Sequence, residues 1–174
     1  MSPRIALCLL LLLTQHTLQA QEFPKGWVLP IELGQGLRTV SALHTDLYVG
    51  SVQLEPMYTL PGNRLRVGAT LGGLYTNRMG EGMAGPRLAL KLTDGPKLMK
   101  STVYNLQVFG EHLWATHDIR LYGGGLALEV GQLGLFSLRA YHEYEHHEFW
   151  LQVSLGFNLH ILWEDSDASN DPLR

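Results

Sequence analysis

This chain has few charged residues and a single cysteine. Charged side chains make up 17% of it, against roughly 25% in an ordinary soluble domain. Cys8 alone allows no internal disulfide, and no C-x-x-C pair is present to bind zinc. The net charge of -3 provides no basic surface for nucleic acid. No run of 18 apolar residues occurs, which argues against a transmembrane helix.

The first twenty residues are typical of an export signal. Arg4 precedes an unbroken apolar run at residues 5–13, and Ala20 is a small residue before a possible cleavage point. This run is too short to span hydrocarbon about 30 Å thick, which requires roughly 20 residues. We therefore expect residues 1–20 to be removed as a signal peptide, and Cys8 with them.

Most of the remaining chain alternates between apolar and polar residues. From Phe149 to Trp163 every odd-numbered residue is apolar, a pattern that a strand places on one face and a helix would scatter. The nineteen glycines also argue against a helical bundle, because each interior glycine costs a helix about 1 kcal/mol. The alternation predicts eight strands, at residues 27–42, 46–60, 63–77, 84–92, 102–115, 119–131, 134–146 and 148–163.

Short connections join the predicted strands. Residues 61–63 and 93–96 have the composition of tight turns, whereas residues 77–83 predict a longer, glycine-containing loop. Eight strands joined in this way close most simply into a barrel, which leaves no exposed sheet edge. We predict an all-β fold, an eight-stranded antiparallel up-and-down transmembrane β-barrel at residues 21–163, followed by a disordered acidic tail at residues 164–174.

Aromatic residues on the apolar face of the predicted strands gather near the strand ends. Tryptophan and tyrosine collect at membrane–water interfaces, because their rings are apolar and their tips form hydrogen bonds. Two such rings indicate that the apolar face points outward into lipid. The predicted interface aromatics are Trp27, Tyr58, Tyr104, Phe136 and Trp163 at the end that holds the termini, and Tyr48, Tyr75, Trp114, Tyr122, Tyr144 and Phe149 at the other end.

The polar face carries six acidic and six basic residues. Five of the bases are arginine, which forms bidentate ion pairs suited to burial. Glycines on the same face, such as Gly85 and Gly125, would make room for long side chains in an interior only just wide enough for them. The predicted ionic network of the lumen comprises Glu32, Arg38, Glu55, Arg64, Arg66, Arg87, Lys91, Glu111, Glu129, Arg139, Glu143 and Glu145.

The stretch from Phe149 to Trp163, with its terminal aromatic, resembles the closing strand of bacterial outer-membrane β-barrel proteins. From Trp27 to Trp163 the pattern resembles the small eight-stranded family of the OmpA transmembrane domain and OmpX. Members usually end at the aromatic residue, whereas here an acidic tail follows. The resemblance implies a place in the outer membrane of a Gram-negative-type cell, with outer-membrane lipids and the assembly machinery as partners.

The histidine-rich segment from His142 to Glu148 is the most site-like part of the sequence. Two imidazoles on one face of the predicted strand, His142 and His146, and a nearby carboxylate could bind a metal such as zinc. No complete set of ligands with defined geometry is evident, so a polar hairpin tip is the alternative. The weak metal candidates are His142, His146, His147 and Glu148.

The sequence predicts no catalytic site and no cofactor. A lipid A or phospholipid hydrolase or acyltransferase would need a nucleophile, a base and an orienting acid. His142 could be the base and Glu143 or Glu145 the acid, but Ser137 and Ser154 are predicted to face inward. Eight strands leave no aqueous channel. We expect a monomeric, non-enzymatic barrel with a structural, stability or surface-interaction role; a lipid-modifying enzyme and a soluble lipocalin-like carrier are the alternatives.

Overall fold

The computed structural model describes residues 26–39, 48–76, 80–98, 101–131, 133–145 and 147–159. The predicted signal peptide at residues 1–20 and the predicted acidic tail at residues 164–174 lie outside these ranges, as do His146 and Trp163. The described residues include no helix long and apolar enough to cross a membrane.

The described chain is built of β-strands. Each principal strand alternates buried and exposed residues, as the sequence pattern predicts. The strands are β1 (Gly26–Val28), β2 (Pro30–Thr39), β3 (Tyr48–Leu54), β4 (Met57–Thr59), β5 (Leu65–Tyr75), β6 (Gly80–Asp94), β7 (Lys97–Leu98), β8 (Ser101–Thr102), β9 (Tyr104–Ala115), β10 (Arg120–Val130), β11 (Gly134–Glu143) and β12 (Phe149–Asn158).

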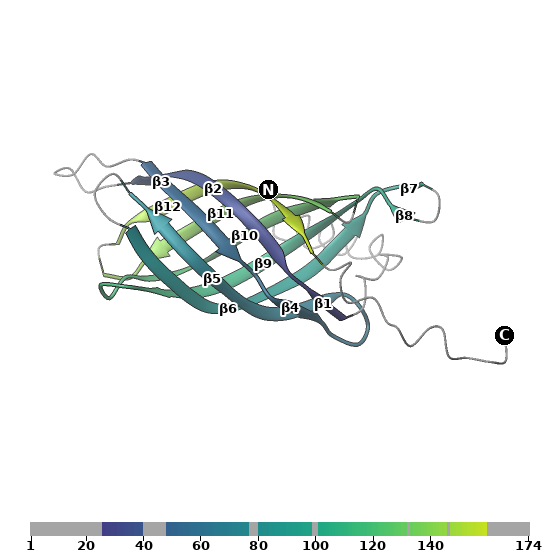
Figure 1. Ribbon diagram of the computed structural model, residues 1–174, viewed down its shortest axis with the longest axis horizontal. Helices are drawn as coiled ribbons and strands as arrows, with labels where there is room; N and C mark the ends of the chain where they lie inside the picture. The colour runs from purple at the N-terminus through teal and green to yellow at the C-terminus, as the bar shows by residue number, and fades with distance from the viewer. Residues whose placement is uncertain are drawn as a thin grey trace, which may run out of the picture.

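The strands close into a barrel (Figure 1). Strands β1 and β2 form one path broken at Leu29, and β3 and β4 form another broken at Glu55 and Pro56, so the chain crosses the barrel eight times. Every pairing is antiparallel, and the last strand, β12, closes the sheet against β2 in a register that runs from Phe149 beside Thr39 to Asn158 beside Pro30. The predicted eight-stranded antiparallel up-and-down barrel is confirmed.

The fourth crossing is longer than the sequence predicted. Strand β6 begins at Gly80, and residues 80–83 pair with residues 72–75 of β5, so the predicted loop at residues 77–83 is wrong over its second half. The sequence does not predict this part of the strand because Gly80 and Gly82 have no side chains to alternate with their neighbours, although their backbones pair with β5. The small β7–β8 hairpin, also absent from the prediction, projects beyond the barrel end at which β12 ends (Figure 1).

The barrel wall is apolar on its outer face and largely polar on its inner face, which is the opposite of a soluble protein. Large apolar side chains lie exposed on the outside, with Leu33 63% and Leu155 64% accessible. Glu32 and Arg139 are fully buried inside. The interior also holds aromatic rings on the polar face of the strands, such as Trp150. The charged side chains therefore form much of the core of this fold.

Many glycines sit where neighbouring strands approach closely. A Cβ at Gly85 would overlap the backbone carbonyl oxygen of His112, and one at Gly125 would overlap that of Leu138. The neighbouring backbone, more than any ionic side chain, thus explains why a side chain is excluded, and this corrects the prediction. Glycines at such close contacts help a sheet to curve and close. The same overlap occurs at Gly36, Gly68, Gly72, Gly123, Gly124 and Gly156.

Replacing Gly125 by Ala should destabilise the barrel by about 1–3 kcal/mol, because the added methyl forces a shift of the β11 backbone. Gly110→Ala is the matched control, since the nearest atom to a Cβ there is the Gly123 carbonyl oxygen at 3.8 Å. Urea unfolding midpoints of the two variants in the same lipid or detergent test this. Equal midpoints would show that the barrel does not depend on a glycine at this close contact.

Candidate functional site

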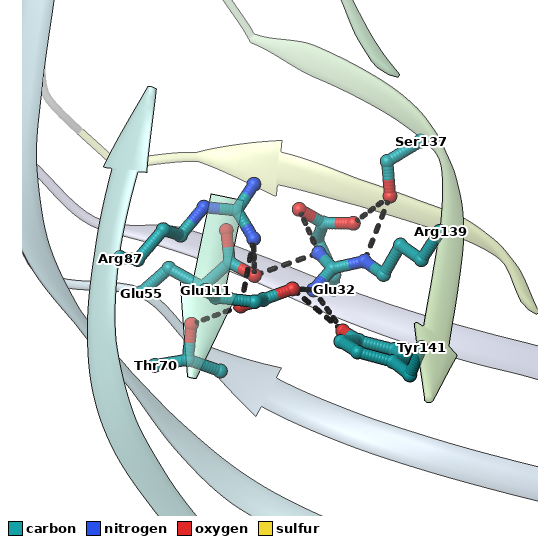
Figure 2. A network of polar contacts seen from close by, with 8 residues as sticks. All are labelled: Glu32, Glu55, Thr70, Arg87, Glu111, Ser137, Arg139 and Tyr141. Carbon is teal, nitrogen blue, oxygen red and sulfur yellow. Dashed lines mark hydrogen bonds and ion pairs between the residues drawn. The ribbon is translucent and has the colours of Figure 1, made fainter. Parts of the chain in front are cut away.

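A buried ion-pair network centred on Arg139 fills part of the barrel interior (Figure 2). One terminal nitrogen of its guanidinium lies 2.6 Å from Oε1 of both Glu32 and Glu55. The other donates to Glu111 Oε1 at 3.2 Å, and Nε donates to Ser137 Oγ at 3.1 Å. The carboxylates come from β2, the break between β3 and β4, and β9. One side chain of β11 therefore ties together segments from around the barrel.

Arg87 of β6 completes the network from another strand. Its Nη1 atom donates to Glu55 Oε1 at 2.7 Å and lies 3.4 Å from Glu111 Oε2. Two neutral hydroxyls satisfy the remaining lone pairs of Glu111: Tyr141 donates to Oε1 at 2.6 Å and Thr70 to Oε2 at 2.7 Å (Figure 2). Charge-assisted hydrogen bonds from several donors are the arrangement that makes buried carboxylates tolerable.

An aromatic ring lies against both guanidinium groups. The Arg87 guanidinium carbon is 3.8 Å from the centroid of the Phe109 ring, and that of Arg139 is 5.1 Å away. A guanidinium over an aromatic face is attracted by the ring quadrupole, most strongly when both are shielded from water. Phe109 and Tyr141 were missed by sequence reasoning, although both are aromatics on the otherwise polar face, which is the signal that could have identified them.

Further ion pairs accompany the central network. Arg66 pairs with Glu129 at 3.1 Å, with both side chains buried. Lys91 pairs with Asp94 at 2.7 Å, near the end of β6. At the opposite end of the barrel, the Arg38 guanidinium contacts the buried Glu148 carboxylate.

Two residues predicted to lie in the lumen are exposed instead, so their placement inside the barrel is wrong. Arg64 lies in the turn before β5, directly after Asn63, whose positive φ of 51° ends the strand alternation. Glu145 lies in the turn after β11. Glu143, the last residue of β11, is fully buried. The predicted strands at 63–77 and 134–146 extended the alternation into these turns, where it no longer applies.

A second polar cluster lies at the rim opposite the barrel end at which β12 ends. The Thr116 hydroxyl donates to Glu81, and the His117 Nδ1 atom lies 2.9 and 3.0 Å from the two carboxylate oxygens of Glu81. This hydrogen bond and the negative charge of Glu81 raise the pKa of His117 above its usual range. The Thr116 hydroxyl and the His117 imidazole both bond to Glu81 and not to each other. The cluster therefore lacks the hydroxyl-to-imidazole contact by which a base activates a hydroxyl nucleophile.

The metal candidates do not form a ligand set among the described residues. No group of three or more potential ligands is present in that part of the chain. The His142 and His147 rings lie 5.9 Å apart, but Glu148 contacts Arg38, and His146 is outside the described residues. A metal site that uses Glu148 would have to break its ion pair.

Neither serine that was weighed as a nucleophile lies on the outer surface with His142. The Ser137 hydroxyl donates to Glu32 Oε2 at 2.5 Å inside the lumen, and Ser154 is buried. His142 lies beside Tyr122, with ring centroids 5.1 Å apart. The geometry therefore assembles no serine-based catalytic group around His142 among the described residues.

The predicted interface aromatics lie on the outer surface wherever the structure describes them. Each is exposed, and Trp163 lies outside the described residues. The exposed aromatics are Trp27, Tyr48, Tyr58, Tyr75, Tyr104, Trp114, Tyr122, Phe136, Tyr144 and Phe149.

Replacing Arg139 by Met should cost about 3–5 kcal/mol of unfolding free energy, because it leaves buried carboxylates without their main counter-charge. Arg64→Met is the control: it removes the same charge from an exposed turn and should cost about 0–1 kcal/mol. Adding Glu55→Gln to the Arg139 variant should recover part of the loss. Denaturant titration of the three variants tests this, and equal costs for Arg139→Met and Arg64→Met would contradict it.

Comparisons with known proteins support the fold and no particular family. No family model matches the chain, and no curated protein matches it. A solved structure described as "De novo design of transmembrane beta-barrels" is similar, with a TM-score of 0.52 and 13% sequence identity, over 80% of this chain and 100% of that one. At this identity the likeness concerns the fold alone. The chain thus has the closed antiparallel barrel architecture of a designed transmembrane β-barrel, without a demonstrated tie to the OmpA and OmpX family.

Proposed function

We propose that this protein is a small monomeric β-barrel of the outer membrane of a Gram-negative-type cell, with a structural, stability or surface-interaction role. It is proposed to conduct no solutes and to catalyse no reaction. Its partners are the surrounding lipids and the machinery that assembles outer-membrane barrels. The assignment to the outer membrane is based on the predicted export signal and on the resemblance of the strand pattern to the small eight-stranded barrels.

The inverted polarity of the barrel wall is the observation that carries the proposal. The outer surface presents apolar side chains along every principal strand, among them Leu33, Leu126 and Leu155. A monomeric soluble protein rarely exposes a contiguous apolar patch larger than a few hundred Å². In a bilayer the same surface is favourable, and the closed sheet satisfies the backbone hydrogen bonds that lipid cannot.

The dimensions of the strands also suit a bilayer. A tilted transmembrane strand needs about 9–11 residues, and β10 has 11 while β11 and β12 have 10 each. Exposed aromatics lie at both ends of the apolar band, with Tyr104 near one end and Tyr122 near the other. This is the arrangement of the aromatic girdles of outer-membrane barrels.

The interior favours this proposal over a carrier or a pore. An apolar ligand would meet the buried charges of Arg87, Arg139 and Glu111 rather than an apolar cavity. Arg139, Tyr141 and Trp150 are each nearly inaccessible, so large side chains occupy the interior. An eight-stranded barrel has room for its own side chains and little else.

A single outward-facing charge distinguishes lipid from water around the barrel. Leu126→Arg, in the middle of β10, should destabilise a membrane-inserted barrel by about 2–4 kcal/mol, whereas Val130→Arg at the strand end should cost about 0–1 kcal/mol. Both positions are exposed to a similar extent, 45% and 46%. Unfolding titrations in lipid vesicles provide the measurement. Changes within about 0.5 kcal/mol at both positions, as at a water-exposed surface, would favour the soluble carrier.

Cell fractionation tests the proposed location. The protein should sediment with membranes, resist extraction by alkaline carbonate, and follow the outer-membrane fraction on a density gradient, because its apolar band is stable only in lipid. Recovery in the soluble periplasmic fraction without detergent would overturn membrane insertion. Recovery with the inner membrane would overturn the outer-membrane assignment alone.

A further inference from the structure

Six outward-facing side chains form a compact patch at one sector of the rim, where β9, β10 and β11 lie side by side. Arg120 is directly opposite Trp114 of β9, and its carbonyl oxygen accepts a hydrogen bond from the Tyr144 amide at 3.0 Å on the other side. All three residues are exposed. The Arg120 residue is therefore flanked by two exposed aromatic residues, at the level of the belt of interface aromatics at this rim.

The row next to Arg120, closer to the apolar band, places two histidines around a tyrosine. Tyr122 of β10 pairs in register with His112 of β9 and with His142 of β11. The His112 ring stacks on that of Trp114 at 4.8 Å, and the Tyr122 ring lies 5.1 Å from that of His142. These six residues, the rim patch, are His112, Trp114, Arg120, Tyr122, His142 and Tyr144.

The rim patch retains hydrogen-bonding capacity that the protein does not use. The Nε2 atom of His112 and the Nδ1 atom of His142 are both shielded from water and lack a hydrogen-bond partner. A shielded polar atom without a partner is destabilising unless something else supplies the bond. Both histidines lie on the outer face and are partly exposed, so a ligand on the surface reaches these two nitrogens only when the side chains that shield them shift.

Basic side chains are confined to this sector of the outer rim among the described strands. Outward positions near the same rim on β2, β3, β5 and β6 are occupied by uncharged residues, including Thr39, Tyr48, Tyr75 and Gly82. If basic side chains served only to place the barrel in the interface between water and lipid, they would be expected around the whole rim. Their position in one sector indicates a local ligand instead. Two exposed acids, Asp118 and Glu145, lie in the adjoining turns, and among the six patch residues Arg120 carries the permanent charge.

We propose that the rim patch binds the phosphate-bearing headgroup of a lipid in the surrounding leaflet. Arg120 would hold the phosphate through two parallel N–H donors, the geometry that makes guanidinium a phosphate-binding group. His112 and His142 would supply further donors once the side chains that shield them shift, and the flanking rings would pack on the apolar part of the same lipid. The inference rests on the proposed membrane insertion and adds a specific partner to it.

Lipid retention in native mass spectrometry tests the inference on the full chain in detergent micelles. The probes are phosphatidylglycerol and a diacyl glycolipid that has no phosphate. The unmodified chain should retain phosphatidylglycerol in preference to the glycolipid. Arg120→Gln and the double variant His112→Phe/His142→Phe should each weaken retention about tenfold, the consequence of losing about 1.4 kcal/mol of charge-assisted bonding.

Arg64→Gln is the matched control, because it removes one exposed arginine from a turn at the other end of the barrel. The specific site would be overturned if all variants retained phosphatidylglycerol as well as the unmodified chain does. It would also be overturned if Arg64→Gln weakened retention as much as Arg120→Gln does. The lipid recovered from the unmodified protein could lack an acyl chain that the lipid recovered from His142→Ala retains. That result would overturn both the binding role and the non-enzymatic function. Each variant is first reconstituted into vesicles: an unmodified chain that does not insert refutes the proposed function, whereas insertion without selective retention refutes this inference alone.

Discussion

The fold depends on keeping two arginines and three glutamates out of water in direct contact with one another. Arg139 contacts Glu32, Glu55 and Glu111, and Arg87 contacts two of the same carboxylates. An isolated buried ion carries a penalty of several kcal/mol, so these groups are compatible with a stable interior only together. Because they come from strands around the barrel, their pairing also fixes how the strands are placed.

With the charges in the interior, most of the large apolar side chains lie on the outside of the wall, and the others form two buried clusters inside it. This reverses the usual distribution of a folded domain, and it suits a protein whose solvent is hydrocarbon. The glycines at close strand contacts serve the same end. They let the strands curve tightly at positions such as Gly85 and Gly125, so that eight strands close around a core made of side chains. Closure gives each of the eight crossings a paired neighbour on both sides among the described residues.

The strand alternation was sufficient to predict the barrel, because a period of two residues reports directly which side chains share a face. It also placed aromatics such as Tyr122 and Trp114 on the outside. It could not predict which acid meets which base, since Arg139 and Glu32 lie on strands far apart in sequence, and the pairing follows from register and tilt. Alternation also misassigned Arg64 and Glu145, because it says nothing of where a strand gives way to a turn. Alternation could not predict the rim patch either, because its histidines become neighbours of Tyr122 only through the register of three strands.

The most direct test of the inverted wall is nuclear magnetic resonance of the protein in lipid nanodiscs, with cross-relaxation recorded from the acyl-chain protons to side-chain methyl groups. Methyl groups of outward residues such as Leu33, Leu126 and Leu155 should receive magnetisation from the acyl chains. Those of the buried Val49 and Leu121 should receive none directly. The reverse pattern, or contacts from lipid to both sets alike, would contradict a barrel with its charged side chains inside and its apolar side chains in lipid.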